Sequence, residues 1–162
     1  MTLPNIYTIG YEGASTEDLI AALKEAGVTR LLDIRESPYS RRHEFSTDEL
    51  SAVLESYGIA YSHIGELGNP PAGREAARAG HMAAYREIFA AHLDGPDGQK
   101  GLERALALAG HESVCLLCLE KAPSHCHRSI VAARMNAISG QEIVHLRVQR
   151  RSAHPAQTGF DF

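Results

Sequence analysis

Short apolar runs that alternate with amphipathic helical segments are the feature that most constrains the fold of this chain. Runs rich in β-branched and aromatic residues predict strands, and the segments between them have the apolar spacing of helices. The predicted strands cover residues 6–9, 28–34, 59–64, 114–119 and 141–148, and the predicted helices cover 15–27, 47–58, 81–93, 97–109 and 130–138. Strands joined through helices make right-handed crossovers and parallel pairs. The sequence therefore predicts a three-layer α/β domain with an about five-stranded, mostly parallel sheet and helices on both faces.

Length and composition indicate a single domain. The chain has 162 residues, which is the length of one ordinary domain, and 44% apolar residues suffice for a sizeable core. We expect a single α/β domain over residues 1–148, without internal repeats, and a polar C-terminal tail over 149–162. Residues 65–80 are rich in Gly, Pro and Arg, and we expect them to form a mobile lid or binding loop.

Charge and hydropathy limit the partners. The net charge is −4, so no global basic field attracts nucleic acid, and binding to a polyanion would need a local basic patch. No segment approaches the roughly eighteen apolar residues of a membrane-spanning helix, and the first residues do not form a signal peptide. We therefore expect a cytoplasmic protein without a membrane partner. Three closely spaced cysteines favour reduced thiols or a metal site over a disulfide framework.

Polar side chains stand at the carboxyl ends of the predicted strands. Ligands of open α/β sheets bind at this edge, where the direction of the crossovers changes. We expect that change between the first and fourth strands, side by side at the centre of the sheet. The candidate substrate-binding residues from the first three strands and their loops are Gly10, Tyr11, Asp33, Arg35, Arg41, Arg42 and His63.

Each of these candidates also has a purely structural interpretation. Asp33 and Arg35 share one face of their strand, so an ion pair between them fits the sequence as well as a binding role does. His63 and His145 fit structural histidines better than ligands or bases. The glycines after the first strand do not form a G-x-G-x-x-G fingerprint, which disfavours a dinucleotide site.

The fourth strand leads into a reactive stretch, residues 115–129, that contains all three cysteines. Because side chains alternate along a strand, Cys118 and Glu120 share one face and Cys115 points to the other. We therefore expect Cys115 in the core, and the C-x-x-C spacing does not predict a redox motif.

The helix after this strand begins near Cys126, His127 and Arg128. Backbone amides at a helix start favour an anion, and the guanidinium of Arg128 adds a forked cation. The same field lowers the pKa of a nearby thiol, Cys126 or Cys118, and so favours a thiolate. Glu120 and His127 are the candidate proton carriers.

Zinc binding is an alternative interpretation of the same stretch. Cys118, Glu120, Cys126 and His127, or His125 in place of His127, have the chemistry of zinc ligands. Their spacing matches no common structural zinc site, and a domain of this size can fold without a metal. The sequence leaves a zinc cofactor open.

Four motifs spread from Tyr7 to about Val148 carry a family resemblance. They are Tyr7-Thr8-Ile9-Gly10, Leu32-Asp33-Ile34-Arg35 with Pro38 and Ser40, Tyr61 to Gly68, and Cys118-x-Glu120 followed by Cys126-His127-Arg128. In these motifs the chain resembles the bacterial and archaeal family known as domain of unknown function 488. The resemblance implies an α/β fold with a site at the strand ends, and no established reaction. Many relatives have His-Ser where this chain has Tyr11-Glu12, so any role of that histidine is lost.

A weaker resemblance links the chain to rhodanese-like sulfurtransferases. Residues 33–36 echo their strand-end Asp-x-Arg, and a cysteine after an apolar strand followed by Arg128 echoes their active-site loop. The loop between Cys118 and Arg128 is several residues too long for the compact anion cradle of that family. The likeness is therefore architectural.

Three functional hypotheses follow. The leading one is an enzyme, a hydrolase or transferase, that acts on an anionic, phosphate-bearing substrate such as a nucleotide or a nucleic-acid end. The anion would be held by Arg35, Arg128 and Arg41 or Arg42, and catalysis or metal binding would fall to Cys118, Glu120, Cys126 and His127. The alternatives are a non-catalytic module that binds nucleic acid or a small anion, with or without zinc, and a thiol-based sulfurtransferase.

Overall fold

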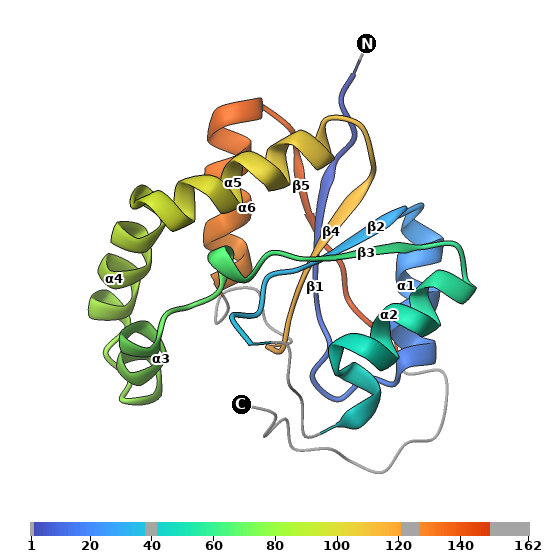
Figure 1. The fold of residues 1–162 in the computed structure, drawn as a ribbon, viewed down its shortest axis with the longest axis horizontal. Helices are drawn as coiled ribbons and strands as arrows, with labels where there is room; N and C mark the ends of the chain where they lie inside the picture. The colour runs from blue at the N-terminus through green and yellow to red at the C-terminus, as the bar shows by residue number, and fades with distance from the viewer. Residues whose placement is uncertain (1, 38–41, 121–126, 150–162) are drawn as a thin grey trace.

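The structure is a computed structural model that describes residues 2–37, 42–120 and 127–149. Within these residues the chain forms one five-stranded sheet in the order β3-β2-β4-β1-β5, and every strand pair is parallel (Figure 1). The strands are β1 (Ile6–Gly10), β2 (Arg30–Asp33), β3 (Ala60–His63), β4 (Val114–Cys118) and β5 (Ile143–His145). The helices are α1 (Thr16–Ala26), α2 (Thr47–Ser56), α3 (Pro71–Arg78), α4 (Met82–Asp94), α5 (Pro96–Ala109) and α6 (His127–Ser139), with short 3-10 turns η1 (His43–Phe45) and η2 (Gly65–Leu67). The predicted three-layer α/β fold is confirmed.

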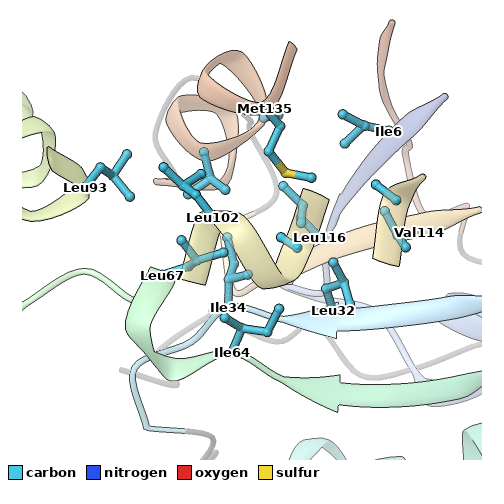
Figure 2. Close-up of a cluster of buried hydrophobic side chains, with 14 of the residues drawn as sticks. Ile6, Leu32, Ile34, Ile64, Leu67, Leu93, Leu102, Val114, Leu116 and Met135 are labelled. Carbon is cyan, nitrogen blue, oxygen red and sulfur yellow. The ribbon is translucent and has the colours of Figure 1, made fainter. Parts of the chain in front are cut away.

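Helices cover both faces of this sheet (Figure 1). On one face, Leu102 of α5 and Met135 of α6 pack over Leu116 of β4 (Figure 2). On the other face, α1 and α2 bury leucines such as Leu19 and Leu50 in a second core. Because both faces of β4 are covered, all five of its residues are buried, which explains the unbroken apolar run in the sequence.

The strand order places the change in crossover direction at the centre of the sheet. β1 pairs with β4, and Gly10 lies opposite Cys118. The chain leaves β1 through α1, which packs on one face, and leaves β4 through α6, which packs on the other. The loops after these neighbouring strands therefore separate, and such a gap is where α/β proteins bind ligands. The prediction that the first and fourth strands are neighbours is confirmed.

Residues 65–80 differ from the prediction. They contain η2 and α3 rather than an irregular loop. Pro71 stands at the start of α3, where a helix tolerates a proline because that amide needs no partner. At Gly73, a Cβ atom would lie 2.1 Å from Oδ1 of Asn69, so the glycine that suggested a loop is required by close packing. The expected irregular loop is therefore wrong, whereas the expected lid stays a prediction, and the segment does line the pocket described below.

The ends of the elements are otherwise close to the prediction. Ser15 caps α1 with a capping box, and Gly27 ends that helix in a left-handed conformation. No helix in the described parts of the chain is long and apolar enough to cross a membrane. The predicted tail lies outside the described residues from 150 onward.

Candidate functional site

A pocket of about 790 Å³ lies across the carboxyl ends of β1, β2 and β4, where the crossovers change direction. We call it the cleft. Its floor comes from the strand ends and the start of α6, and one wall comes from α3 and the start of α4. The lining residues are Tyr11, Arg35, Glu36, Ser37, Asn69, Arg74, Ala77, Arg78, Met82, Cys118, Leu119, Glu120 and His127. Five of the predicted site residues therefore share one cavity: Tyr11, Arg35, Cys118, Glu120 and His127.

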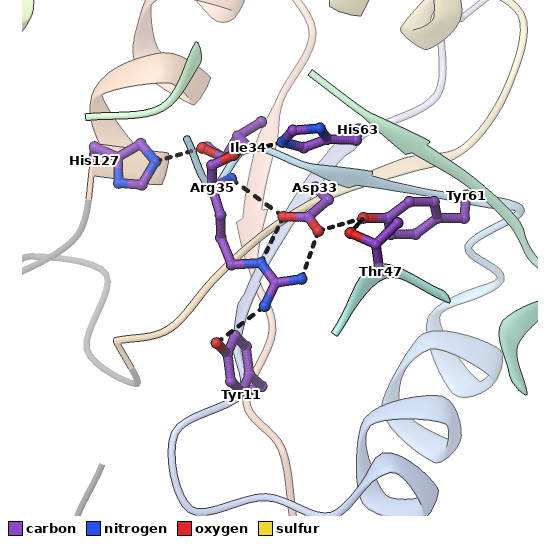
Figure 3. Close-up of polar contacts among 8 residues, drawn as sticks. All are labelled: Tyr11, Asp33, Ile34, Arg35, Thr47, Tyr61, His63 and His127. Carbon is purple, nitrogen blue, oxygen red and sulfur yellow. Dashed lines mark hydrogen bonds and ion pairs between the residues drawn. The ribbon is translucent and has the colours of Figure 1, made fainter. Parts of the chain in front are cut away.

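An ion pair at the end of β2 anchors one side of the floor (Figure 3). Arg35 donates from Nε to Oδ1 of Asp33 at 2.8 Å and from Nη2 to Oδ2 at 2.6 Å. The Tyr61 hydroxyl donates to the same carboxylate at 2.5 Å. Asp33 is fully buried, so it depends on these donors for the solvation that it lost on folding. The pairing that the sequence left open is thus present.

The carboxylate of Asp33 also affects the protonation of its partners. Burial lowers the pKa of Arg35, but the hydrogen bonds and charge of Asp33 outweigh burial and raise this pKa above its ordinary value. Burial and Asp33 raise the pKa of Tyr61 above its ordinary range. Both groups therefore stay protonated at neutral pH.

Tyr11 connects this ion pair to the cleft. Its hydroxyl accepts a hydrogen bond from Nη1 of Arg35 at 3.2 Å, and the guanidinium carbon lies 5.4 Å from the ring centroid. The ring stacks on Phe45 with centroids 4.4 Å apart. These contacts hold Tyr11 in one orientation, with its hydroxyl beside the guanidinium.

The sulfur of Cys118 lies on the floor beside two charged groups. Its Sγ is 3.5 Å from Nη1 of Arg128 and 3.6 Å from Oε2 of Glu120. Cys118 is disulfide-bonded in the structure, so the expectation of reduced thiols is wrong here. Alternation along a strand gives the face on which a side chain lies and not its bonding partner, so the sequence did not indicate the bond.

Cys115 lies in a different environment from Cys118. It is free, fully buried and part of the core beneath α1 and α2, on the face of β4 opposite to Cys118. Burial raises the pKa of its thiol above the usual range, and the charge of Arg128 opposes this only partly. The prediction that Cys115 belongs to the core is confirmed.

Arg128 is the largest fully buried side chain among the described residues. Its Nε donates to the Thr8 hydroxyl at 3.1 Å, and its Nη1 donates to the backbone carbonyl oxygen of Glu120. Burial lowers the pKa of this guanidinium, while the nearby Cys115 thiol and the carboxylate of Glu120 act in the opposite direction. Arg128 does not line the cleft itself. It supports the floor through its contacts with Cys118 and the Glu120 backbone.

Gly10 makes room for this arginine. A Cβ atom at this position would lie 1.8 Å from the carbonyl oxygen of Glu120 and 2.8 Å from Nη1 of Arg128. The residue therefore serves the site by having no side chain, and it does not contact the cleft.

His127 lines the cleft at the start of α6. Its Nε2 lies 2.8 Å from the Ile34 carbonyl oxygen, to which it donates, and its ring packs edge-on against Phe89 at 5.5 Å between centroids. Burial lowers its pKa to about 4, and the charge of Arg128 acts in the same direction, whereas the Ile34 carbonyl opposes them. His127 is therefore a neutral hydrogen-bonding group at neutral pH.

Two predicted binding residues lie away from the cleft. His63 contacts the Arg35 carbonyl oxygen through Nε2 at 2.7 Å and supports the backbone after β2. Arg42 pairs with Glu44 at 3.1 Å and lies over the ring of Phe45. Neither lines the cavity.

Arg41, Cys126 and the alternative ligand His125 lie outside the described residues. Among the residues that are described, no three His, Cys, Asp or Glu side chains gather closely enough to hold a metal ion. Because Cys126 belongs to the suggested ligand set, the zinc hypothesis stays a prediction.

The wall formed by α3 and α4 was not predicted. It contributes Arg74 and Arg78, which are one helical turn apart and so lie on one face of α3. Arg74 pairs with Glu36 at 2.5 Å across the cavity rim. The signal was present in the sequence as two arginines at helical spacing, but the residues that this helix packs on the core are alanines, which give a weak apolar pattern.

One family profile matches the chain, and it covers most of the elements that build the cleft. The family is described as "Domain of unknown function DUF488", and the match spans residues 15–135. No curated protein and no solved structure matches the chain.

Proposed function

The chain belongs to the DUF488 family of unknown function, and from the cleft we propose an enzyme that hydrolyses an anionic, phosphate-bearing substrate with Cys118 as nucleophile. One observation carries the proposal: the Cys118 sulfur lies in the cleft 3.5 Å from a buried guanidinium and 3.6 Å from a carboxylate. A neighbouring cation stabilises a thiolate, and a neighbouring carboxylate can take the thiol proton.

Arginines support an anionic substrate. Arg35, Arg74 and Arg78 line the cleft, and guanidinium groups match the geometry of phosphate oxygens. Arg35 and Arg74 already have carboxylate partners. Arg78 is exposed and makes no ion pair within the described part of the chain, so it is the cation most available to a ligand.

The reaction begins after the disulfide at Cys118 has been reduced by a small thiol. The Cys118 thiol gives its proton to Glu120, and the thiolate forms beside Arg128. The sulfur electron pair then makes a bond to phosphorus, while the bond from phosphorus to the leaving oxygen breaks. That oxygen keeps the electron pair and takes the proton from Glu120. Water then forms a bond to phosphorus and loses a proton to Glu120, and the sulfur leaves as thiolate.

The test is hydrolysis of 4-nitrophenyl phosphate and bis(4-nitrophenyl) phosphate by reduced protein. Cys118→Ser should lower kcat by about a thousandfold or more, because an alcohol is a far weaker nucleophile at neutral pH. Cys115→Ser is the matched control, since this thiol is buried on the opposite face of β4. Arg78→Ala should raise KM more than it lowers kcat. Full activity of Cys118→Ser, or no hydrolysis of either ester by the wild type, contradicts the proposal.

Sulfur transfer is the second candidate, and the disulfide at Cys118 favours it. A sulfur that accepts a disulfide bond can also carry a persulfide sulfur. Treatment of the reduced protein with thiosulfate should then add the mass of one sulfur atom to the peptide that contains Cys118. An unchanged mass counts against this function.

A further inference from the structure

A hydrogen-bonded path runs from the surface to the site through Thr8. The side chain of Thr8 is fully buried on β1. Its hydroxyl lies 3.1 Å from Nε of Arg128 and 2.5 Å from Nδ1 of His145. We propose that Thr8 and His145 are positioning residues that hold the Arg128 guanidinium against the sulfur of Cys118. The inference rests on the proposed role of Cys118.

The register of the sheet supports this role. Thr8 lies opposite His145 in the pairing of β1 with β5, and Gly10 lies opposite Cys118 in the pairing of β1 with β4. Thr8 and Gly10 share one face of β1 because they are two residues apart. The Arg128 side chain lies along that face: its Nε is at Thr8, and its Nη1 is so close to Gly10 that a Cβ atom there would be 2.8 Å away. Thr8 therefore holds the Nε end of the guanidinium, and the Nη1 end lies beside the sulfur.

The direction of the hydrogen bonds is determined by chemistry. A guanidinium only donates, so the oxygen of Thr8 accepts from Arg128. The single proton of the hydroxyl is then available to Nδ1 of His145, which must carry a lone pair. Burial and the charge of Arg128 lower the pKa of His145, which favours this neutral form. Each of the three groups therefore fixes the orientation of the next.

Loss of the Thr8 hydroxyl would leave the Nε–H of a buried guanidinium without this acceptor. Such a group turns toward other acceptors because an unsatisfied buried donor is costly. The guanidinium would then move from the sulfur, and the thiolate would lose the stabilising charge of Arg128. The expected result is a less reactive Cys118 in a protein that still folds.

The experiment measures alkylation of Cys118 by iodoacetamide across a pH series after reduction with a phosphine. Trypsin cleavage after Lys121 separates the peptide of Cys118 from that of Cys126, and Cys115 on the same peptide is distinguished by fragment ions. Thr8→Val should slow alkylation of Cys118 about tenfold at pH 7, which corresponds to a rise of about one unit in its pKa.

Conservative variants distinguish a positioning role of Thr8 and His145 from a role in packing alone. Thr8→Ser keeps the hydroxyl and should stay within about twofold of wild type, and His145→Asn should do the same because its amide oxygen can accept from Thr8. His145→Leu removes that acceptor and should slow alkylation by about threefold, a smaller effect because the hydroxyl remains. Thr29→Val is the matched control, since Thr29 precedes β2 at the end of the strand opposite to the cleft and its hydroxyl hydrogen-bonds to the Ser113 backbone.

The outcomes are distinct. Wild-type rates for a folded Thr8→Val variant, or equal slowing by Thr8→Ser and Thr8→Val, overturn the positioning role and leave the nucleophile untouched. If Thr8→Val does not fold, the comparison of His145→Leu with His145→Asn decides, and equal rates overturn the role. A wild-type Cys118 that reacts no faster than a cysteine in an unfolded peptide overturns both this inference and the proposed function.

Discussion

Two buried arginines support the cleft, and they face different groups. Arg35 makes two hydrogen bonds to the carboxylate of Asp33, whereas the contacts of Arg128 include a hydroxyl, a sulfur and a carbonyl oxygen. The pKa of Arg35 is raised by its carboxylate partner, and the pKa of Arg128 is lowered by burial. A cation that is already matched by a carboxylate stabilises the fold, while one disfavoured by burial gains more from a new negative charge. We therefore expect Arg35 to stabilise the fold, and we propose that Arg128 stabilises the thiolate of reduced Cys118.

The largest effect is expected from breaking the matched pair. Asp33→Asn keeps the shape of the side chain but leaves the charge of Arg35 buried without a carboxylate. We expect the free energy of unfolding to fall by about 3–5 kcal/mol, measured by urea denaturation. Asp94→Asn, which breaks the exposed pair with Arg134, is the control and should cost less than about 1 kcal/mol. Equal small losses in both variants would mean that Arg35 is solvated, and the contrast with Arg128 would fail.

His127 precedes Arg128 in α6 and contacts the carbonyl oxygen of Ile34, the residue before Arg35, and it should make stability depend on pH. Its pKa is about 4 in the folded protein and 6.5 in the unfolded chain, so the unfolded chain binds the extra proton first. The contribution is fully present above pH 6.5, is lost as the pH falls from 6.5 to 4, and reaches up to about 3 kcal/mol. Urea denaturation at a series of pH values should show this slope in the wild type and a flatter curve in His127→Asn. Parallel curves for the two proteins would show that His127 is solvated.

Strand periodicity predicted much of this arrangement. Alternation along a strand depends only on local geometry, so it correctly separated Cys118 from Cys115 and placed Asp33 with Arg35. The order of elements similarly predicted the parallel sheet and the central pairing of the first and fourth strands. These features follow from rules that act within one strand or between one strand and the next helix.

Other parts of the site depend on contacts that no local rule describes. Thr8 contacts His145 because β5 adds to the edge beside β1, and the two residues are 137 positions apart. The structural role of Gly10 depends on how closely Arg128 and the Glu120 carbonyl approach. The wall with Arg74 and Arg78 depends on a short helix that packs alanines rather than large apolar residues on the core. These parts of the site follow from strand register and close packing, which the sequence pattern does not predict.

A methyl group at Gly10 tests how closely Arg128 must fit. In Gly10→Ala the Cβ atom would overlap the carbonyl oxygen of Glu120, and both this backbone and the guanidinium would have to move. We expect a loss of about 1–3 kcal/mol in the free energy of unfolding and slower alkylation of Cys118. Gly110→Ala is the matched control, because a Cβ atom there makes only ordinary contacts of 3.5 Å or more. Unchanged reactivity in Gly10→Ala would show that Arg128 does not need its present position.

The smallest effect on stability is expected at the rim of the cleft, where Arg74 pairs with Glu36. Both side chains are partly exposed, so Glu36→Gln should change the free energy of unfolding by less than about 1 kcal/mol. The same change removes a negative charge from the cleft and releases Arg74, so inorganic phosphate should bind about threefold to tenfold more tightly by titration calorimetry.

Glu44→Gln is the control, since it breaks the pair with Arg42 outside the cavity and should leave phosphate binding unchanged. If both variants bind phosphate as the wild type does, the wall of α3 does not contact the anion. Arg78 would then lose its assigned role, and anion binding would have to come from the floor, where Arg35 is already matched by Asp33.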